Sequence, residues 1–298
     1  MIYITTAVLF YFINFIYIKI WKKIKKSTPT GVGIFLIFHL FFYIMVSEYS
    51  LFYFILLVMF SFFYYLDDLI TINFKWRILI QILTPVIIYF STNHLFSINT
   101  FILIILFFFI LINTLNFQDG EDLNIGILLS MLFLAFYFYS TDLFVKKTSG
   151  LILMYLIAFV IFNRKKNFLY LGDTGCYISS IIIFLFMIND FNNHLLIKVL
   201  LSIIYFPIID VFFVQFYRIY KKENLLSRNY LHVYQILFRK IKSKIYLLPN
   251  IIFALINISI TIQMQLSIKL IFVLTFLNIV FCVILRLMIS KFTNYYEN

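Results

Sequence analysis

Long apolar runs recur along almost the whole chain and are separated by short polar stretches. A transmembrane helix needs roughly 20 residues, and tilt or packing against neighbouring helices allows somewhat fewer. Because 64% of the 298 residues are hydrophobic and only 12% are charged, a soluble domain could not cover this much apolar surface. The sequence therefore predicts an all-α integral membrane protein, a polytopic bundle of about eleven transmembrane helices. These runs are 2–19, 33–47, 50–66, 77–92, 99–113, 126–141, 149–163, 176–189, 195–214, 246–263 and 268–289.

Basic residues are distributed unevenly between the two alternating sets of loops. Of the 24 Lys and Arg, all but Lys146, Lys147, Lys198 and Lys269 lie in or beside one set. That set consists of loops 20–32, 67–76, 114–125, 164–175 and 215–245 and the C-terminal tail. Since cytoplasmic loops are enriched in Lys and Arg, we expect the N-terminus outside, the C-terminus in the cytoplasm, and a location in the bacterial inner membrane. The net charge of +12 then reflects topology, and no nucleic-acid partner is expected.

Acidic residues gather on the same predicted cytoplasmic side. The chain has 12 Asp and Glu, and many of them lie in these loops or at the ends of the spans beside them. Acidic residues contribute little to topology, and carboxylates that converge repel one another unless a cation holds them. Oxygen ligands of this kind suit Mg²⁺, with Mn²⁺ as an alternative, bound together with phosphates. The residues concerned are Asp67, Asp68, Asp119, Glu121, Asp122, Asp173 and Asp210.

The pair Asp67-Asp68 directly follows an apolar run. Acidic residues at a membrane boundary are costly and usually functional, although a solvated helix end is the alternative. Lys75 and Arg77 follow, and they suit either an anionic lipid head group or neutralisation of the pair.

A second polar segment runs from Asn113 to Asp122. Asn113 and Asn116 stand about one helical turn apart, and Gly120 permits a turn that brings Asp119 and Asp122 together. The alternative is an ordinary loop, which would also be rich in Asn, Asp and Gly.

Three further segments are rich in polar residues. In 163–175, glycines flank Asp173, and backbone N–H groups at the start of the next helix suit phosphate, unless Asp173 or Thr174 is simply a helix N-cap. The segment 25–33 joins lysines to a Pro/Gly turn, which suits either phosphate or a positive-inside anchor. Loop 215–245 contains His232 and an amphipathic run that suits an anionic membrane surface.

In this order, the segments resemble those of the polyprenyl-phosphate N-acetylhexosamine-1-phosphate transferases, which include the enzyme that makes lipid I and those that start O-antigen glycans. The family's N-x-x-N-x-x-D-G-x-D segment is reproduced by 113–122, and its lysine-containing T-P-T-G-G segment is similar to 25–33. The Asp pair, the G-D-x-G segment, P-x-x-D at 207–210 and the histidine segment at 232–235 also match. Leu123 stands where the family usually has Gly, Cys176 where it has Ser, and Tyr170 where it has Phe.

The resemblance implies a single transferase domain over 1–298 that transfers N-acetylhexosamine-1-phosphate from a UDP-sugar to undecaprenyl phosphate. Its products would be a lipid-diphospho-sugar and UMP, at the start of a cell-envelope glycan. A single His followed by Tyr-Gln resembles the subgroup that acts on 6-deoxy sugars. The implied catalytic and Mg²⁺-binding residues are Asp67, Asp68 and Asp173. The implied substrate-binding residues are Lys25, Lys75, Asn113, Asn116, Asp119, Asp122, Tyr170 and His232.

Two other classes of function stay open. A lipid-linked sugar transporter or flippase predicts charges at mid-span positions, where this chain has almost none. An intramembrane aspartyl protease predicts Gly-x-Gly-Asp, and Tyr170-Leu-Gly-Asp173 lacks the first glycine. The sequence leaves open which sugar is transferred, whether attack is direct or passes through a covalent intermediate, and whether the protein is a homodimer.

Overall fold

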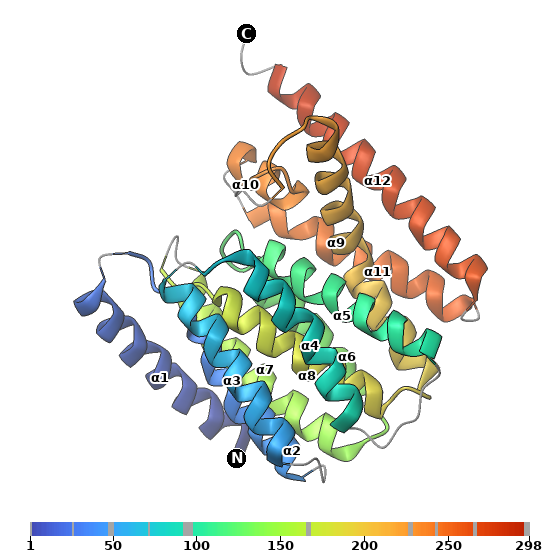
Figure 1. The fold of residues 1–298 in the computed structure, drawn as a ribbon. Helices are drawn as coiled ribbons and strands as arrows, with labels where there is room; N and C mark the ends of the chain where they lie inside the picture. The colour runs from blue at the N-terminus through green and yellow to red at the C-terminus, as the bar shows by residue number, and fades with distance from the viewer. Residues whose placement is uncertain are drawn as a thin grey trace. The chain divides into compact units, whose positions relative to one another are not determined.

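The structure is a computed structural model that describes residues 2–25, 27–46, 51–70, 72–91, 98–164, 168–225, 229–241, 244–264 and 267–294. Within these residues every regular element is a helix (Figure 1). The chain divides into two compact units, Met1–Asn193 (unit 1) and His194–Asn298 (unit 2), and each is described by itself.

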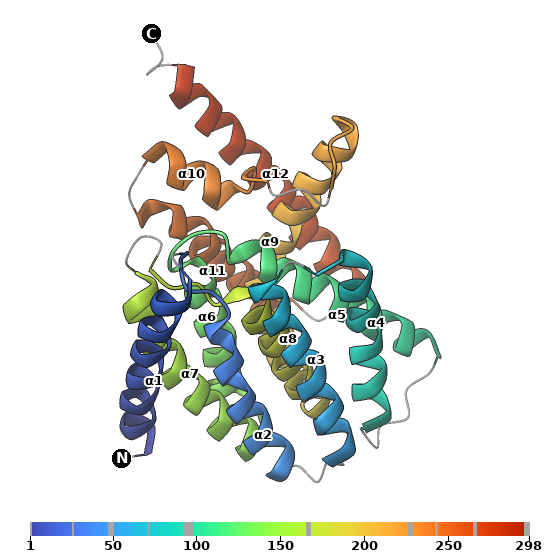
Figure 2. The ribbon, with the colours of Figure 1, turned by 60° about the vertical axis from the view of Figure 1, so that its left-hand side comes forward.

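Unit 1 is built around its last helix. In this unit, α8 packs against α3, α5, α6 and the short helix η1 (Figure 2). In the apolar part of α8, 83% of the residues are buried, whereas in that of α3 only 17% are. Helix α8 therefore forms the core of the unit, and α3 lies at its periphery. The elements of unit 1 are α1 (Ile2–Ile24), η1 (Val32–Leu36), α2 (Ile37–Val46), α3 (Leu51–Leu69), α4 (Phe74–Ser91), α5 (Ile98–Gln118), α6 (Asn124–Tyr139), α7 (Leu143–Asn163) and α8 (Gly172–Asn189).

Unit 2 comprises α9 (His194–Tyr220), α10 (Val233–Ile241), η2 (Lys244–Leu247), α11 (Leu248–Gln263) and α12 (Ile268–Asn294). Pro249 lies in the first turn of α11, where its missing N–H costs no helical hydrogen bond. Hydrogen bonds between side-chain amides stabilise the packing of helices in an apolar environment. The Asn278 side chain of α12 donates a hydrogen bond to Asn257 Oδ1 of α11 at 3.0 Å. Helix α9 packs against both of these helices, and α10 packs against α12 and η2.

The polytopic all-α fold is confirmed, and each predicted apolar run coincides with a helix or with a short helix joined to one. Among the described residues, nine helices are long and apolar enough to span a membrane, and Val32–Val46 and Asn124–Tyr139 are shorter apolar segments. The predicted orientation of the termini stays a prediction, as does the single transferase domain over 1–298.

Several helices continue beyond the predicted ends of the apolar runs. Asp67 and Asp68 lie in the last turn of α3, Asn116 lies in α5, and Asp173 lies in the first turn of α8, rather than in loops. Hydropathy falls where polar side chains begin, whereas a helix continues until its backbone hydrogen bonds end, and this explains the shifted boundaries.

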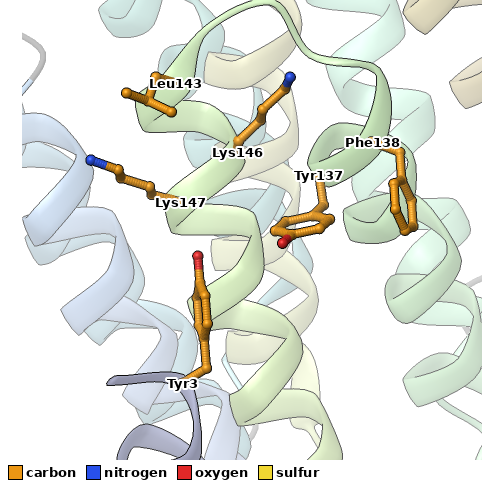
Figure 3. A pocket seen from close by; sticks show the side chains of 6 residues that line it. All are labelled: Tyr3, Tyr137, Phe138, Leu143, Lys146 and Lys147. Atoms are coloured by element: carbon orange, nitrogen blue, oxygen red, sulfur yellow. The ribbon is translucent and has the colours of Figure 1, made fainter. Parts of the chain in front are cut away.

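A shallow hollow of about 470 Å³ opens where α1 and α7 begin and α6 ends. Figure 3 shows its lining, which consists of Tyr3, Tyr137, Phe138, Leu143, Lys146 and Lys147. The hollow lies at the start of α7, whereas Asn163, at the other end of that helix, bonds to the segments that carry the acidic cluster described next. The hollow is therefore separate from that cluster.

Candidate active site

Two loops of unit 1 pack together beside the start of α8. The backbone N–H of Gly33 donates to the carbonyl of Leu171 at 3.0 Å, and the N–H of Tyr170 donates to the carbonyl of Pro29 at 2.9 Å. These bonds join the segment 25–33 to the segment 168–175. Two of the segments that the sequence indicated as functional are therefore neighbours.

Glycines make this close approach possible. Gly31 and Gly172 have φ of 79° and 83°, in the left-handed region that L-residues rarely adopt. A Cβ on Gly172 would lie 2.5 Å from the Gly31 nitrogen, and one on Gly33 would lie 2.1 Å from the Gly175 Cα. Backbone atoms cannot yield as a flexible side chain can, so these positions require glycine for geometric reasons.

The carboxylates of Asp68 and Asp119 bind the N-terminus of α8. Asp68 accepts hydrogen bonds from the backbone N–H of Asp173 at 3.0 Å and of Thr174 at 3.1 Å, and from the Thr174 hydroxyl at 2.5 Å. Asp119 Oδ2 accepts the N–H of Gly172 at 2.7 Å. Negative charge is favourable at this end of a helix, because the first N–H groups have no partner within the helix.

Two interpretations of this helix start need correction. Neither Asp173 nor Thr174 is the N-cap, since Leu171 holds that position and makes no side-chain cap hydrogen bond. The first N–H groups of α8 are also not directed at a free phosphate, because the carboxylates of Asp68 and Asp119 occupy them. These carboxylates come from distant segments, which is why local sequence patterns indicated a local cap.

Arg77 links two other acidic residues. Its Nη1 lies 3.2 Å from Asp67 Oδ2 and 3.1 Å from Asp173 Oδ2. Asp67 is further held by the backbone N–H of Ile72 at 2.6 Å, and the Asn116 side chain hydrogen-bonds to the carboxyl of Asp173. The prediction that Arg77 neutralises the acidic pair is thus confirmed for Asp67, and the structure adds Asp173.

The carboxyl group of Asp119 lies buried against the start of α8. Burial raises the pKa of the Asp119 carboxyl well above its ordinary value, the Gly172 N–H opposes the shift, and the charges of Asp68 and Asp173 add to it. Its second oxygen, Oδ1, is buried and has no hydrogen-bond partner. A buried carboxylate oxygen without a partner is unfavourable, so this atom suits a ligand or a cation.

Asn163 connects the acidic loop 119–123 to the segment before α8. Its Oδ1 accepts the N–H of Leu123 at 2.5 Å, and its Nδ2 donates to the carbonyl of Leu169 at 2.7 Å. Leu123 has a φ of 67°, the left-handed conformation for which the family's usual glycine is suited. The bond to Asn163 and the burial of the Leu123 side chain hold the strained backbone in place.

The remaining predicted binding residues of unit 1 lie around this cluster at different depths. Lys25 Nζ donates to the carbonyl of Leu69 at 2.6 Å, at the end of α3. The Asn113 side chain donates to Gln81 Oε1 at 3.0 Å, so it joins α5 to α4. Asp122 is buried, Tyr170 is half-buried, and Lys75 is exposed.

His232 belongs to unit 2, where a second ionic cluster surrounds it. Its Nδ1 lies 3.0 Å from Asp210 Oδ2, and Arg286 Nη2 lies 2.6 Å from Asp210 Oδ1. The sequence motifs did not indicate Arg286. A basic residue within an otherwise apolar span is usually functional, and this signal could have identified it.

Residues 50–190 match the model of glycosyl transferase family 4, a segment that includes every acidic residue of the cluster in unit 1. Over these residues the chain is similar to glycosyltransferase family 4. No curated protein matches the chain. The predicted resemblance is therefore confirmed over this segment, and the match supports an enzyme of the phospho-sugar transferase type. The long apolar helices support a multi-pass membrane protein.

Proposed function

We propose that this glycosyltransferase family 4 protein transfers an N-acetylhexosamine-1-phosphate from a UDP-sugar to undecaprenyl phosphate, on the cytoplasmic side of a bacterial inner membrane. The transfer would start a cell-envelope glycan. The observation that carries the proposal is the convergence of Asp67, Asp68, Asp119 and Asp173 with Arg77 at the start of α8.

The charge of this cluster favours a cation together with phosphates. The cluster has four carboxyl groups, and only Asp67 and Asp173 pair with the guanidinium of Arg77. Carboxylates brought together raise each other's free energy. A pyrophosphate alone would be repelled. A divalent cation between carboxylates and phosphate oxygens would balance both charges.

The residues fit Mg²⁺, with Mn²⁺ as the alternative. Among the described residues, no three His, Cys, Asp or Glu side chains lie close enough together to hold a metal ion by themselves. Mg²⁺ commonly binds one or two carboxylates together with substrate phosphates and waters, and the Asp67 and Asp173 oxygens around Arg77 are such a pair. When bound, the ion would neutralise charge that develops on the leaving UMP.

The protein's own side chains would position the reactants. An oxygen of the lipid phosphate, already largely ionised at neutral pH, attacks the β-phosphorus of the UDP-sugar, and the bond from that phosphorus to the UMP oxygen breaks. Asn116, Asp119 and Asp122 would orient the nucleotide. Lys25, Lys75 and His232 would contact phosphate or sugar. Because close glycine contacts and backbone hydrogen bonds hold the segment around Asp173, the carboxylate would need little reorganisation during transfer.

The test is transfer in membranes that contain the full chain. Membranes are incubated with undecaprenyl phosphate and a series of UDP-N-acetylhexosamines, including 6-deoxy sugars, with Mg²⁺ or with EDTA. We expect UMP and a lipid-diphospho-sugar to form in equal amounts, only without EDTA. Movement of a lipid-linked sugar across the membrane without release of UMP would instead identify a flippase and overturn the proposal.

A further inference from the structure

The second ionic cluster, in unit 2, joins three segments that are far apart in sequence. Asp210 comes from α9, His232 immediately precedes α10, and Arg286 comes from α12. Asp210 and His232 have side chains only 2% exposed, and Arg286 is 16% exposed. This cluster lies outside residues 50–190, the segment that matches the family model.

Every oxygen of the Asp210 carboxylate has a partner. Oδ1 faces Arg286 Nη2 at 2.6 Å, and Oδ2 faces His232 Nδ1 at 3.0 Å. The backbone N–H of Val233 donates to both oxygens, at 3.3 and 3.2 Å. Since a carboxylate only accepts, His232 must carry its proton on Nδ1, and the ring is thereby held in one orientation.

Arg286 reaches the same segment a second time. Its Nη1 donates to the carbonyl of Leu231 at 2.8 Å, while its guanidinium lies 4.5 Å from the centre of the Phe213 ring. One guanidinium therefore binds both the carboxylate that holds His232 and the backbone beside it. A planar fork of donors suits this double contact, which a lysine could not reproduce.

We propose that Arg286 and Asp210 are positioning residues that fix the ring of His232 for contact with the substrate. Arg286 acts through Asp210 and through the Leu231 carbonyl, and does not itself touch the substrate. This proposal rests on the proposed function in one respect, because that function supplies the substrate that His232 would contact. The geometry of the ring can be tested without any activity.

The first test measures the reactivity of His232 with diethyl pyrocarbonate in the full-length protein, with His194, an exposed histidine, as the internal reference. In the wild type, we expect slow modification, because the ring is buried and paired. Arg286→Met should raise the rate for His232 about tenfold by loosening the segment, and Arg286→Lys should give an intermediate rate. An unchanged rate in Arg286→Met would overturn the proposal.

Loss of any buried arginine could also disturb folding, so the test needs matched variants. Arg218 is buried in the same unit, and its side chain bonds to Glu223, Asn224 and Leu225. Arg218→Met should leave the His232 rate at the wild-type value. If Arg286→Met does not fold, Asp210→Leu with Arg286→Met removes both charges together, which buried pairs tolerate better, and should still expose His232.

The second test is a double-mutant cycle on transfer activity. If Arg286 acts through His232, Arg286→Met lowers kcat/KM in the wild type but has no further effect in His232→Ala. Additive losses would show an independent role and overturn the proposal. If the wild type releases no UMP with any donor, the proposed function is wrong. The reactivity of His232 would then test the positioning role by itself.

Discussion

The two ionic clusters differ in their balance of charge. In unit 1, the carboxyl groups of Asp67 and Asp173 face the single guanidinium of Arg77, and those of Asp68 and Asp119 bind backbone N–H groups of α8. In unit 2, the carboxylate of Asp210 faces Arg286 and His232. The first cluster has more carboxyl groups than cationic groups and contains a buried Asp119 oxygen without a hydrogen-bond partner. The second has a partner for each carboxylate oxygen of Asp210.

This difference indicates different tasks. A cluster with more carboxyl groups than cationic groups gains stability from a cation that binds from outside, as a site for metal and phosphate would. A cluster balanced within itself orients a side chain and needs no external ion. Divalent cations should therefore raise the thermal stability of unit 1 and leave that of unit 2 unchanged.

The largest expected effect is on catalysis in unit 1. Asp173→Asn should lower transfer at least about 100-fold, because a neutral amide cannot hold the charge that the phosphates require. The measurement is UMP release in membranes at matched protein levels. Asp142→Asn is the control, since Asn caps a helix as well as Asp and residue 142 caps α7 away from the cluster. Full activity in Asp173→Asn would remove the basis for a catalytic cluster.

A substitution in the glycine-lined backbone should affect folding and transfer together. In Gly172→Ala, the left-handed conformation alone costs roughly 1–2 kcal/mol, and the new Cβ also meets the Gly31 nitrogen. We expect a lower melting temperature in detergent and little transfer. Gly126→Ala is the control, because its Cβ contacts only side chains of α7. Equal melting temperatures for the two variants would contradict the close approach.

The difference between the two clusters can be tested by replacing Arg77 or Arg286 and measuring how each variant responds to Mg²⁺. Arg77→Met leaves Asp67 and Asp173 facing each other, and Mg²⁺ should restore the lost stability. Because the Arg77 side chain is 36% exposed, we expect the variant to lose about 1 kcal/mol of its free energy of unfolding. Thermal unfolding with Mg²⁺ and with EDTA measures this effect. Arg286→Met should lose stability that Mg²⁺ does not restore, and an equal response of both variants would erase the distinction.

The smallest expected effect concerns Lys75, which is exposed at the start of α4. Lys75→Ala should raise the KM for undecaprenyl phosphate about fivefold, the loss of roughly 1 kcal/mol for one lysine near an anionic head group. Kinetics at low and high salt check this, since screening should shrink the difference. Lys146→Ala, at the opposite end of unit 1, should leave the KM unchanged.

Much of the fold and part of the site followed from the sequence. Apolar runs located every α-helix except α10, because burial in lipid depends on local composition. The acidic pair, the Asn/Asp segment and the G-D-x-G segment named the residues that converge in unit 1. The motif order indicated the family, and residues 50–190 match the model of that family.

Only the tertiary structure decided what each carboxylate does. Asp68 accepts the N–H of a residue 105 positions away, so its role at the start of α8 has no local signature. Leu123 keeps a left-handed backbone because Asn163 holds its N–H, although the residue type predicts otherwise. Arg286 pairs with Asp210 across unit 2. Hydropathy and helical spacing are local properties of a sequence, whereas a hydrogen bond or an ion pair depends on which distant segments packing brings together.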